Sequence, residues 1–277
     1  MHAERPREAG ARAALAPRAG DRLAGKVTLV TGVGAGIGRG IARMFALQGA
    51  CVVGCDIDAA AARDCAEAAA REGTAIDLGG IGEGIDLTQP EAVRGWIDAA
   101  AERHGGIDVL VNAAAWGAFE WLEKMDYQSQ WRRTLTSEVD LVFLACQAAW
   151  PHLKARGGGS VINFASANAR MALAGSAALA HCAGKGAVLA MSRQLAMEGA
   201  PHGIRVNTIS PALVETAATR VPVREVPGFR EQVMAKLMLG RIGQPEDVGW
   251  MAIYLASDES SWVTAADFAI DAGATAW

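Results

Sequence analysis

The stretch Val27-Thr28-Leu29-Val30-Thr31-Gly32-Val33-Gly34-Ala35-Gly36-Ile37-Gly38 decides the fold of this 277-residue chain. A short buried strand runs into a turn with four glycines, and an amphipathic helix is predicted to follow over residues 37–48. Glycine permits a tight turn, a close approach of the backbone to a pyrophosphate, and close packing of helix on strand. The start of the helix then offers free N–H groups and a partial positive charge to phosphates. This turn, placed between a strand and a helix, predicts a dinucleotide-binding site.

An acidic side chain, Asp56, ends the second predicted strand, residues 51–56. An acid about 20 residues past such glycines can accept hydrogen bonds from both ribose hydroxyls of NAD, and it would repel the extra phosphate of NADP. The alternative is that Asp56 caps the next helix, with Asp58 as the rival cap. The ribose role is preferred, so the sequence predicts NAD as the cofactor, with NADP less favoured.

Short apolar strands alternate with amphipathic helices along the rest of the chain. This alternation predicts an α/β fold, a doubly wound parallel sheet of about seven strands with helices on both faces. We find no internal repeat and no Pro/Ser-rich linker, and therefore expect one domain, residues 23–277, after a flexible leader, residues 1–22. Predicted helices span 37–48, 59–71, 91–103, 127–155, 177–199 and 245–256. Predicted strands span 27–30, 51–56, 107–112, 160–165, 204–209 and 268–270. A short strand and a loop are expected in 74–86, and an irregular to helical region in 216–239.

Composition narrows the class of protein. Apolar residues make up 51% of the chain, charged residues 20%, and the net charge is -4, which suits a packed domain rather than a disordered one. There is no basic stripe for nucleic acid and no apolar run long enough to span a bilayer. The first 22 residues lack the apolar core of a signal peptide. The five cysteines form no CxxC pair and no zinc-type spacing, so we expect no metal site and a reducing, cytoplasmic compartment.

From about Leu23 to its C-terminus the chain resembles the short-chain dehydrogenase/reductase family. The resemblance implies a Rossmann fold, hydride transfer between an alcohol and a carbonyl by a nicotinamide cofactor, and a homodimer or homotetramer. Its motifs are Thr31-Gly32-x-x-x-Gly36-x-Gly38, Leu110-Val111-Asn112-Ala113-Ala114, Asn163-Phe164-Ala165-Ser166, Arg205-Val206-Asn207-Thr208-Ile209-Ser210-Pro211, Arg241-Ile242-Gly243-Gln244-Pro245-Glu246-Asp247 and Asp271-Ala272-Gly273.

The same resemblance implies a set of cofactor contacts. Asp86 and Leu87 look like the acid and following residue that contact adenine, and Thr216 matches a position that holds the nicotinamide amide. The full set is Gly32, Gly34, Gly36, Ile37, Gly38, Asp56, Ile57, Asp86, Leu87, Asn112, Ala113, Ala114, Lys185, Pro211, Val214 and Thr216.

Two of the four positions that match the catalytic group of the family carry other residues here. The family uses Tyr-x-x-x-Lys on a long helix, where the lysine holds the cofactor ribose and lowers the pKa of the tyrosine. This chain has His181 four residues before Lys185, and Glu138 falls where the family has a helix asparagine. The strand-end serine is retained as Ser166, with Asn168 near the usual spacing. The resemblance therefore implies Ser166, His181, Lys185 and Glu138 as the catalytic group.

Histidine preserves the capacity for acid–base chemistry at this position. His181 and Lys185 project from one face of a helix, and a neutral imidazole can accept a proton from an alcohol near physiological pH. We expect Ser166 to orient the substrate oxygen and His181 to exchange its proton. Glu138 would relay protons through water or pair with Lys185, and a solvated helix carboxylate is an equal alternative. A spectator role for His181 and a strand-end cap role for Ser166 also stay open.

Aromatic and apolar side chains are predicted in loops after strand ends, where a substrate should enter. They favour an apolar or aromatic alcohol or ketone as the substrate, although core or interface packing accounts for them equally. The region after Pro211 contains prolines and glycines, which favour an irregular lid. The loop residues are Trp116, Phe119, Trp121 and Met171.

Two other functions remain open at this point. The two altered catalytic positions are compatible with a non-catalytic dinucleotide-binding subunit or sensor. His181 and Glu138 are also compatible with a non-redox lyase or isomerase. Self-association follows from the resemblance, and the long predicted helices carry apolar residues that suit an interface or the core, namely Phe143, Leu144, Trp150, Leu189 and Leu195.

Overall fold

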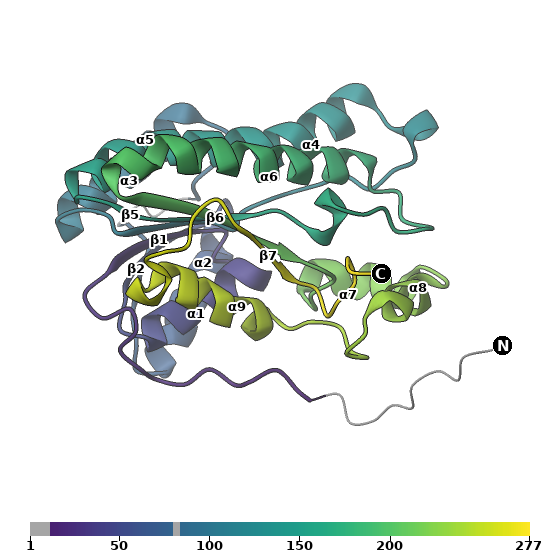
Figure 1. Cartoon of the computed structure of the whole chain (residues 1–277), viewed down its shortest axis with the longest axis horizontal. Coiled ribbons are helices and arrows are strands. Elements are labelled where there is room, and N and C mark those ends of the chain that lie inside the picture. The colour runs from purple at the N-terminus through teal and green to yellow at the C-terminus, as the bar shows by residue number, and fades with distance from the viewer. Residues whose placement is uncertain (1–11, 80–83) are drawn as a thin grey trace.

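The structure is a computed structural model, which describes residues 12–79 and 84–277. These residues form a sheet of seven parallel strands in the order β3-β2-β1-β4-β5-β6-β7 (Figure 1). The doubly wound α/β fold predicted from the alternating pattern is therefore confirmed. The strands are β1 (Val27–Thr31), β2 (Cys51–Cys55), β3 (Ile76–Asp77), β4 (Val109–Asn112), β5 (Gly159–Phe164), β6 (Ile204–Pro211) and β7 (Asp267–Ile270).

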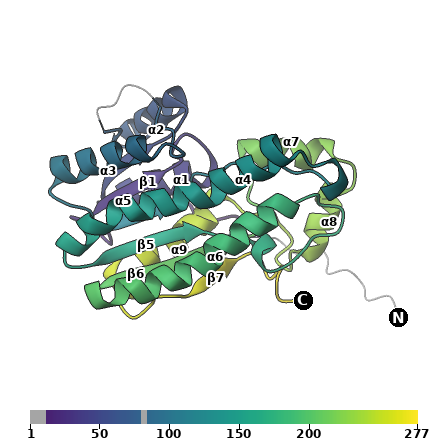
Figure 2. The ribbon, with the colours of Figure 1, turned by 90° about the horizontal axis from the view of Figure 1, so that it is seen from above.

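Helices cover both faces of the sheet, and Figure 2 shows one of these layers lying across the strands. Buried residues fall into two large clusters, one on each face. Helices α1 (Gly36–Leu47), α2 (Ala59–Arg71) and α9 (Pro245–Ala256) pack on one face. Helices α3 (Pro90–His104), α5 (Leu141–Ala155) and α6 (Leu179–Gly199) pack on the other. No helix within the described residues is long and apolar enough to cross a membrane.

The central strand β1 explains why the sheet is buried on both sides. All five of its residues are buried, as expected of a parallel strand between two helix layers. Successive side chains alternate between faces, so Val30 joins the cluster under α1 and α9 while Leu29 joins the cluster under α3 and α5. Each fully buried side chain of this size contributes about 1.5–3 kcal/mol of transfer free energy.

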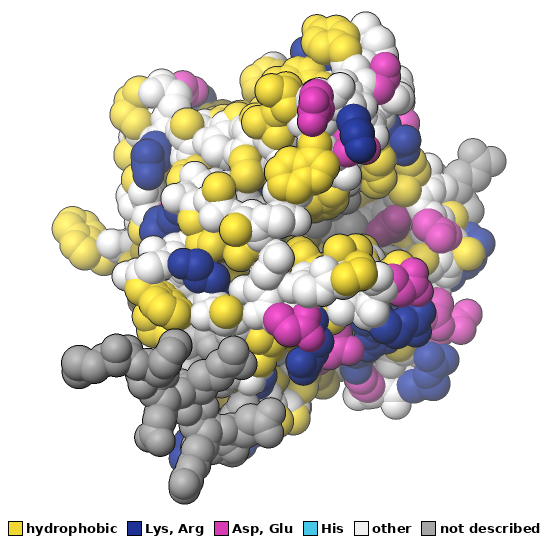
Figure 3. Space-filling view, turned by 90° about the vertical axis from the view of Figure 1, so that its right-hand side faces the viewer, with side chains coloured by type: hydrophobic (Ala, Val, Ile, Leu, Met, Phe, Trp, Pro, Cys, Tyr) yellow, Lys and Arg dark blue, Asp and Glu magenta, His cyan; other side chains and the backbone are white. Residues whose placement is uncertain are grey.

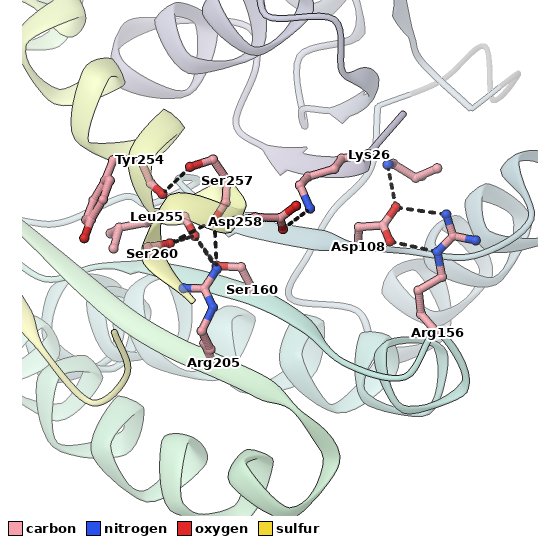
Figure 4. A network of polar contacts seen from close by, with 11 residues as sticks. Lys26, Asp108, Arg156, Ser160, Arg205, Tyr254, Leu255, Ser257, Asp258 and Ser260 are labelled. Atoms are coloured by element: carbon pink, nitrogen blue, oxygen red, sulfur yellow. Dashed lines mark hydrogen bonds and ion pairs between the residues drawn. The ribbon is translucent and has the colours of Figure 1, made fainter. Parts of the chain in front are cut away.

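Polar contacts tie together the amino-terminal ends of the strands (Figure 4). The carbonyl oxygen of Leu255 accepts hydrogen bonds from Ser160 Oγ at 2.7 Å and from Arg205 Nη2 at 2.9 Å. At the neighbouring strands, Arg156 Nε donates to Asp108 Oδ1 at 2.7 Å. Ligands of open parallel sheets bind at the opposite, carboxyl ends. This network therefore holds the framework together at a distance from the expected site.

The long helix predicted over residues 127–155 is interrupted in its backbone pattern. The segments Tyr127–Arg132 and Thr136–Asp140 are π-helical, separated by one α-helical turn, α4 (Arg133–Leu135), and followed by α5. A π-helical bond spans five residues instead of four and rotates the following side chains around the axis. Hydrophobic periodicity predicts that this stretch is helical, but it cannot locate that rotation.

The region predicted as irregular to helical, and as a lid over the substrate, is mostly helical. It contains α7 (Ala217–Glu225), which carries Pro222 in its interior, and α8 (Phe229–Lys236). Pro222 lacks an N–H and removes one helical hydrogen bond, but Thr216 and Thr219 form a capping box that supplies bonds at the start of α7.

The predicted leader lies partly outside the described residues, which begin at residue 12. Residues 12–22 form no helix or strand and run beside α1 and α9 (Figure 1). Their carbonyl groups accept side-chain hydrogen bonds from the folded body, including Gln48 Nε2 to Arg18 at 2.7 Å and Trp250 Nε1 to Leu15 at 3.1 Å. In the predicted strand and loop at 74–86, residues 80–83 also lie outside the described residues, and β3 occupies the start of that stretch.

We predict that Gly38→Ala destabilises the fold, because an added Cβ would lie inside van der Waals contact of the Gly32 carbonyl oxygen. Overpacking of this kind lowers the free energy of unfolding by roughly 1–3 kcal/mol. Gly95→Ala in α3 is the matched control, since its added Cβ meets nothing within 4 Å, and it should be neutral or slightly stabilising. Urea unfolding of both variants measures the difference. Equal stability of the two would contradict the close approach of α1 to the turn.

Candidate active site

The glycine turn leaves the start of α1 open at the carboxyl end of β1. Gly32 has φ +74°, a left-handed conformation, and an added Cβ there would lie 2.8 Å from Ala114 Cα. Helix α1 begins at Gly36 after Ala35, which supplies no capping side chain. The first N–H groups of α1 therefore have no side-chain acceptor, and they are available to a phosphate. The turn fits a dinucleotide pyrophosphate.

Asp56 lies beside this turn and is not the helix cap. Its Oδ2 accepts a hydrogen bond from Gly34 N at 2.8 Å, and its Oδ1 accepts one from Asp58 N at 2.9 Å. Asp58 caps α2 by accepting from Ala60 N and Ala61 N. The alternative that Asp56 caps the helix is therefore wrong. Its half-buried carboxylate stands next to the phosphate turn, where an adenosine ribose would lie.

Thr31 fixes the opposite wall of the cleft. Its Oγ1 accepts hydrogen bonds from Ala113 N and Ala114 N, both at 3.0 Å, and lies 3.3 Å from Val111 O, to which it donates. The chain leaving β4 is thereby held alongside the glycine turn. The predicted contacts Ala113 and Ala114 are half-buried in this wall.

Asn112 takes part in a buried network rather than facing the cleft with its amide. Its side chain is buried, and Nδ2 donates to Asn163 Oδ1 at 2.8 Å. Asn163 in turn donates to Ser192 Oγ on α6 at 2.9 Å. The asparagine of the central motif thus links β4 and β5 to α6, the helix that carries His181 and Lys185.

The remaining predicted cofactor contacts lie at different depths. An added Cβ at Gly36 would lie 3.2 Å from Thr216 Cγ2, so Thr216 borders the glycine turn. Burial raises the pKa of Asp86, but hydrogen bonds from Thr88 outweigh it, and the net shift is downward. Of the others, Leu87, Val214, Pro211 and Gly38 are buried, Ile37 is half-buried, and Ile57 is exposed.

Helix α6 carries His181 and Lys185, one turn apart, at the positions that the resemblance assigns to catalysis. Lys185 is buried, and its Nζ donates to the carbonyl oxygen of Phe164 at the end of β5 at 3.1 Å. Burial lowers the pKa of Lys185, and the negative charge of Glu138 partly opposes that shift. Lys185 is therefore held at the strand end, where the resemblance implies the cofactor ribose.

Glu138 contacts His181, a contact that none of the three roles considered for Glu138 from the sequence included. Its Oε1 lies 2.6 Å from His181 Nδ1, and the side chain is 1% exposed. The alternative of a solvated helix carboxylate is therefore wrong. Within the described part of the chain, Glu138 and Lys185 form no ion pair. Glu138 comes from the π-helical segment Thr136–Asp140, so the local backbone directs it toward α6.

Ser166 follows β5 and caps the single-turn 3-10 helix Ala167–Ala169. Its Oγ accepts from Asn168 N at 3.1 Å, so the cap role left open by the sequence is present. The hydroxyl hydrogen is still free to donate to a substrate oxygen, because the cap uses the oxygen only as an acceptor.

Aromatic side chains border the catalytic positions. The ring of Phe119 lies 5.4 Å from that of His181, and the Arg133 guanidinium lies 3.9 Å from the centroid of the Trp116 ring. Phe119 and Trp121 are exposed, and Figure 3 shows hydrophobic side chains gathered over this end of the molecule. Met171 differs, because it packs with Leu213 and other apolar residues under α8.

Two glycines make room for the Glu138 carboxylate, and neither was predicted from the sequence. An added Cβ at Gly117 would lie 2.9 Å from Glu138 Oε1, and one at Gly184 would lie inside van der Waals contact of Glu138 Oε2. Gly184 stands inside α6, where glycine costs about 1 kcal/mol relative to alanine. A glycine placed inside a helix despite this cost is the feature of the sequence that could have indicated a role for Gly184.

Comparisons with known proteins agree with this geometry. The family model described as Enoyl-(Acyl carrier protein) reductase matches residues 32–275. The chain belongs to the short-chain dehydrogenase/reductase family. It is 36% identical to D-threitol dehydrogenase of Mycolicibacterium smegmatis over 92% of this chain and 94% of that protein. It is also similar to galactitol 2-dehydrogenase (L-tagatose-forming) of Cereibacter sphaeroides, with 35% identity over 92% of this chain and 97% of that one.

A solved structure of the family also matches closely. A 7α-hydroxysteroid dehydrogenase in complex with NADH and 7-oxo glycochenodeoxycholic acid superposes with a TM-score of 0.84 at 29% identity, covering 91% of this chain and 95% of that one. The chain is accordingly an oxidoreductase that uses a nicotinamide dinucleotide and interconverts an alcohol and a carbonyl.

We predict that Gly184→Ala lowers turnover at least tenfold, because the new methyl group would displace the Glu138 carboxylate. Gly186→Ala, two residues along the same helix, is the control, since its added Cβ meets nothing within 4 Å. Both substitutions improve helix propensity equally, so steady-state kinetics of the pair isolates the clash. Full activity in Gly184→Ala would show that the position of Glu138 is not required.

Proposed function

We propose that this protein is an NAD-dependent dehydrogenase in which His181 replaces the family tyrosine as the acid–base group. The observation that supports it is the contact of a largely buried His181 with a buried carboxylate, one helical turn from buried Lys185. A pocket of this kind suits a group that gains and loses a proton in each turnover.

Each side chain has a defined task in the proposed reaction. The bound nicotinamide would supply the hydride acceptor or donor. In alcohol oxidation, Ser166 donates a hydrogen bond that orients the substrate oxygen, and His181 accepts the proton that this oxygen loses. Lys185 holds the cofactor ribose from its position below Phe164. In carbonyl reduction, His181 returns the proton to the oxygen.

Asp56 supports NAD over NADP. Its carboxylate stands at the end of β2 and bonds only to backbone N–H groups among the described residues. It can accept from two ribose hydroxyls at once, and its charge opposes a phosphate at the same place.

The exposed aromatic residues support an apolar or aromatic substrate. Phe119 lies against the His181 ring, and Trp116 and Trp121 are exposed nearby in sequence. The similar 7α-hydroxysteroid dehydrogenase is solved in complex with NADH and 7-oxo glycochenodeoxycholic acid. The relatives are named dehydrogenases, which does not favour a sensor or a lyase.

We propose three further properties of the chain. Residues 23–277 form the catalytic domain after the 1–22 leader. The chain forms a homodimer or homotetramer, for which exposed Phe143 on α5 and the 98% exposed Trp262 offer contact surface. It works in the cytoplasm, which suits its five free cysteines.

We predict that His181→Ala lowers kcat by roughly 10²–10⁴-fold, the usual contribution of a general acid or base. NAD affinity, measured by calorimetry, should stay within about threefold, because the glycine turn is unaltered. Met197→Ala, an exposed position on the same helix, should keep full activity. Equal kcat in His181→Ala and the wild type would remove histidine from the mechanism.

We predict that Asp56→Ala weakens NAD binding about tenfold or more, because it removes hydrogen bonds to an ionised acceptor, worth about 1.5–3 kcal/mol. The preference for NAD over NADP should fall with it. Asp58→Ala is the control, since it removes the α2 cap at a cost of about 1 kcal/mol in stability and should leave the preference unchanged. Calorimetry with both nucleotides tests this, and an unchanged preference in Asp56→Ala would contradict the ribose role.

A further inference from the structure

The contact between Glu138 and His181 bears on which ring nitrogen carries a proton. An ionised carboxylate only accepts hydrogen bonds, so the proton in the 2.6 Å contact belongs to His181 Nδ1. In the neutral ring, Nε2 then holds the free lone pair. We propose that Glu138 is a positioning residue that sets the His181 tautomer and presents Nε2 as the proton-exchanging atom. This inference rests on the proposed acid–base role of His181.

Burial makes this contact the main polar anchor of the carboxylate. Glu138 is 1% exposed, and its Oε2 has no hydrogen-bond partner among the described residues. A buried carboxylate is costly unless it accepts hydrogen bonds, so the bond from Nδ1 to Oε1 carries much of the compensation. The His181 side chain is 17% exposed and reaches the edge of the site.

The surroundings form a slot shaped for the carboxylate. Gly117 approaches Oε1 from the loop after β4, and Gly184 approaches Oε2 from α6. An added Cβ at Gly117 would lie 2.9 Å from Oε1 and 3.6 Å from His181 Nδ1. Two separate elements therefore leave space for one side chain, which argues for a selected position rather than an incidental contact.

The charges around His181 explain why an acid is needed there. Lys185 on α6 is buried and feels the Glu138 charge, and so does Cys182, whose pKa burial raises and Glu138 raises further. Phe119 adds only an uncharged ring. A nearby ammonium disfavours the imidazolium formed when His181 takes up a proton. The contact with Glu138 offsets that repulsion without any side-chain movement.

A phenol could not use the same partner in the same way. Tyrosine has only carbon where His181 has Nδ1, so a tyrosine at 181 would leave Glu138 without this donor. The histidine and the glutamate therefore depend on each other. We expect that His181→Tyr alone does not give an active enzyme, although it introduces the residue that the family uses.

Nitrogen-15 NMR of the histidine-labelled, substrate-free protein tests the tautomer directly, and the His181→Ala spectrum assigns the signal. We expect the neutral ring of His181 as the Nδ1–H form in the wild type, and a shift toward the Nε2–H form in Glu138→Ala. Glu138→Gln should retain the Nδ1–H form, because its amide oxygen still accepts. The same tautomer mixture in the wild type and Glu138→Ala overturns the proposal.

Kinetics provides the second test. Glu138→Ala should lower kcat roughly 10²-fold or more with little change in KM, and Glu138→Gln should lose less. In the His181→Ala background, removing Glu138 should cost less than about threefold, since its partner is already gone. Asp140→Asn, an exposed acid of the same π-helical segment, is the control and should keep full activity. Additive losses in the double variant overturn the proposal.

The two tests separate this inference from the proposed function. If His181→Ala is inactive while Glu138→Ala is fully active, the positioning role fails and the acid–base role stands. If the wild type shows no hydride transfer with any alcohol or ketone, the proposed function fails, and the NMR result alone decides whether Glu138 sets the tautomer.

Discussion

The close approach of α1 to the end of β1 is the constraint on which the site depends. Gly38 lies so near the Gly32 carbonyl that the helix has no room for a side chain there. This approach directs the uncapped start of α1 at the carboxyl end of the sheet. Residues of the same strand and turn also form the walls of the cleft. On one side Gly34 N donates a hydrogen bond to Asp56, and on the other Thr31 holds the chain after β4. Backbone N–H groups suited to a phosphate are thereby already in place at the start of α1.

The cofactor half of the site could be predicted from sequence because its residues are local. A strand, a glycine turn and the start of a helix lie within a dozen consecutive residues, and their geometry is dictated by steric limits that glycine alone relieves. Asp56 follows at a distance fixed by one helix and one strand. The rival interpretation of Asp56 as a cap failed because Asp58, two residues further on, has the position that can reach the first N–H groups of α2.

The catalytic half could be predicted only as a set of positions. Glu138 and His181 are 43 residues apart, and no local pattern encodes their contact. The direction of Glu138 depends on a π-helical segment whose five-residue bonds leave no signature in hydrophobic periodicity. The helices of the predicted lid were difficult to predict for a related reason. Pro222 favours irregular structure locally, but Thr216 caps α7, and α8 packs with Met171 and Leu213. These contacts stabilise the two helices.

The proposed exchange of tyrosine for histidine as the acid–base group would follow an electrostatic rule that also accounts for the acid at 138. A tyrosine that works as a base does so as an anion, and a nearby lysine stabilises that anion. A histidine works as a base in its neutral form and becomes a cation, which the same lysine destabilises. Lys185 is retained in this chain, where its Nζ donates to the carbonyl oxygen of Phe164. A negative charge next to the ring would offset this effect, and Glu138 lies 2.6 Å from His181 Nδ1. A base that becomes a cation thus favours an acidic neighbour, whereas a base that works as an anion favours a basic one. Gly117 and Gly184 supply the space that the acidic neighbour, Glu138, requires.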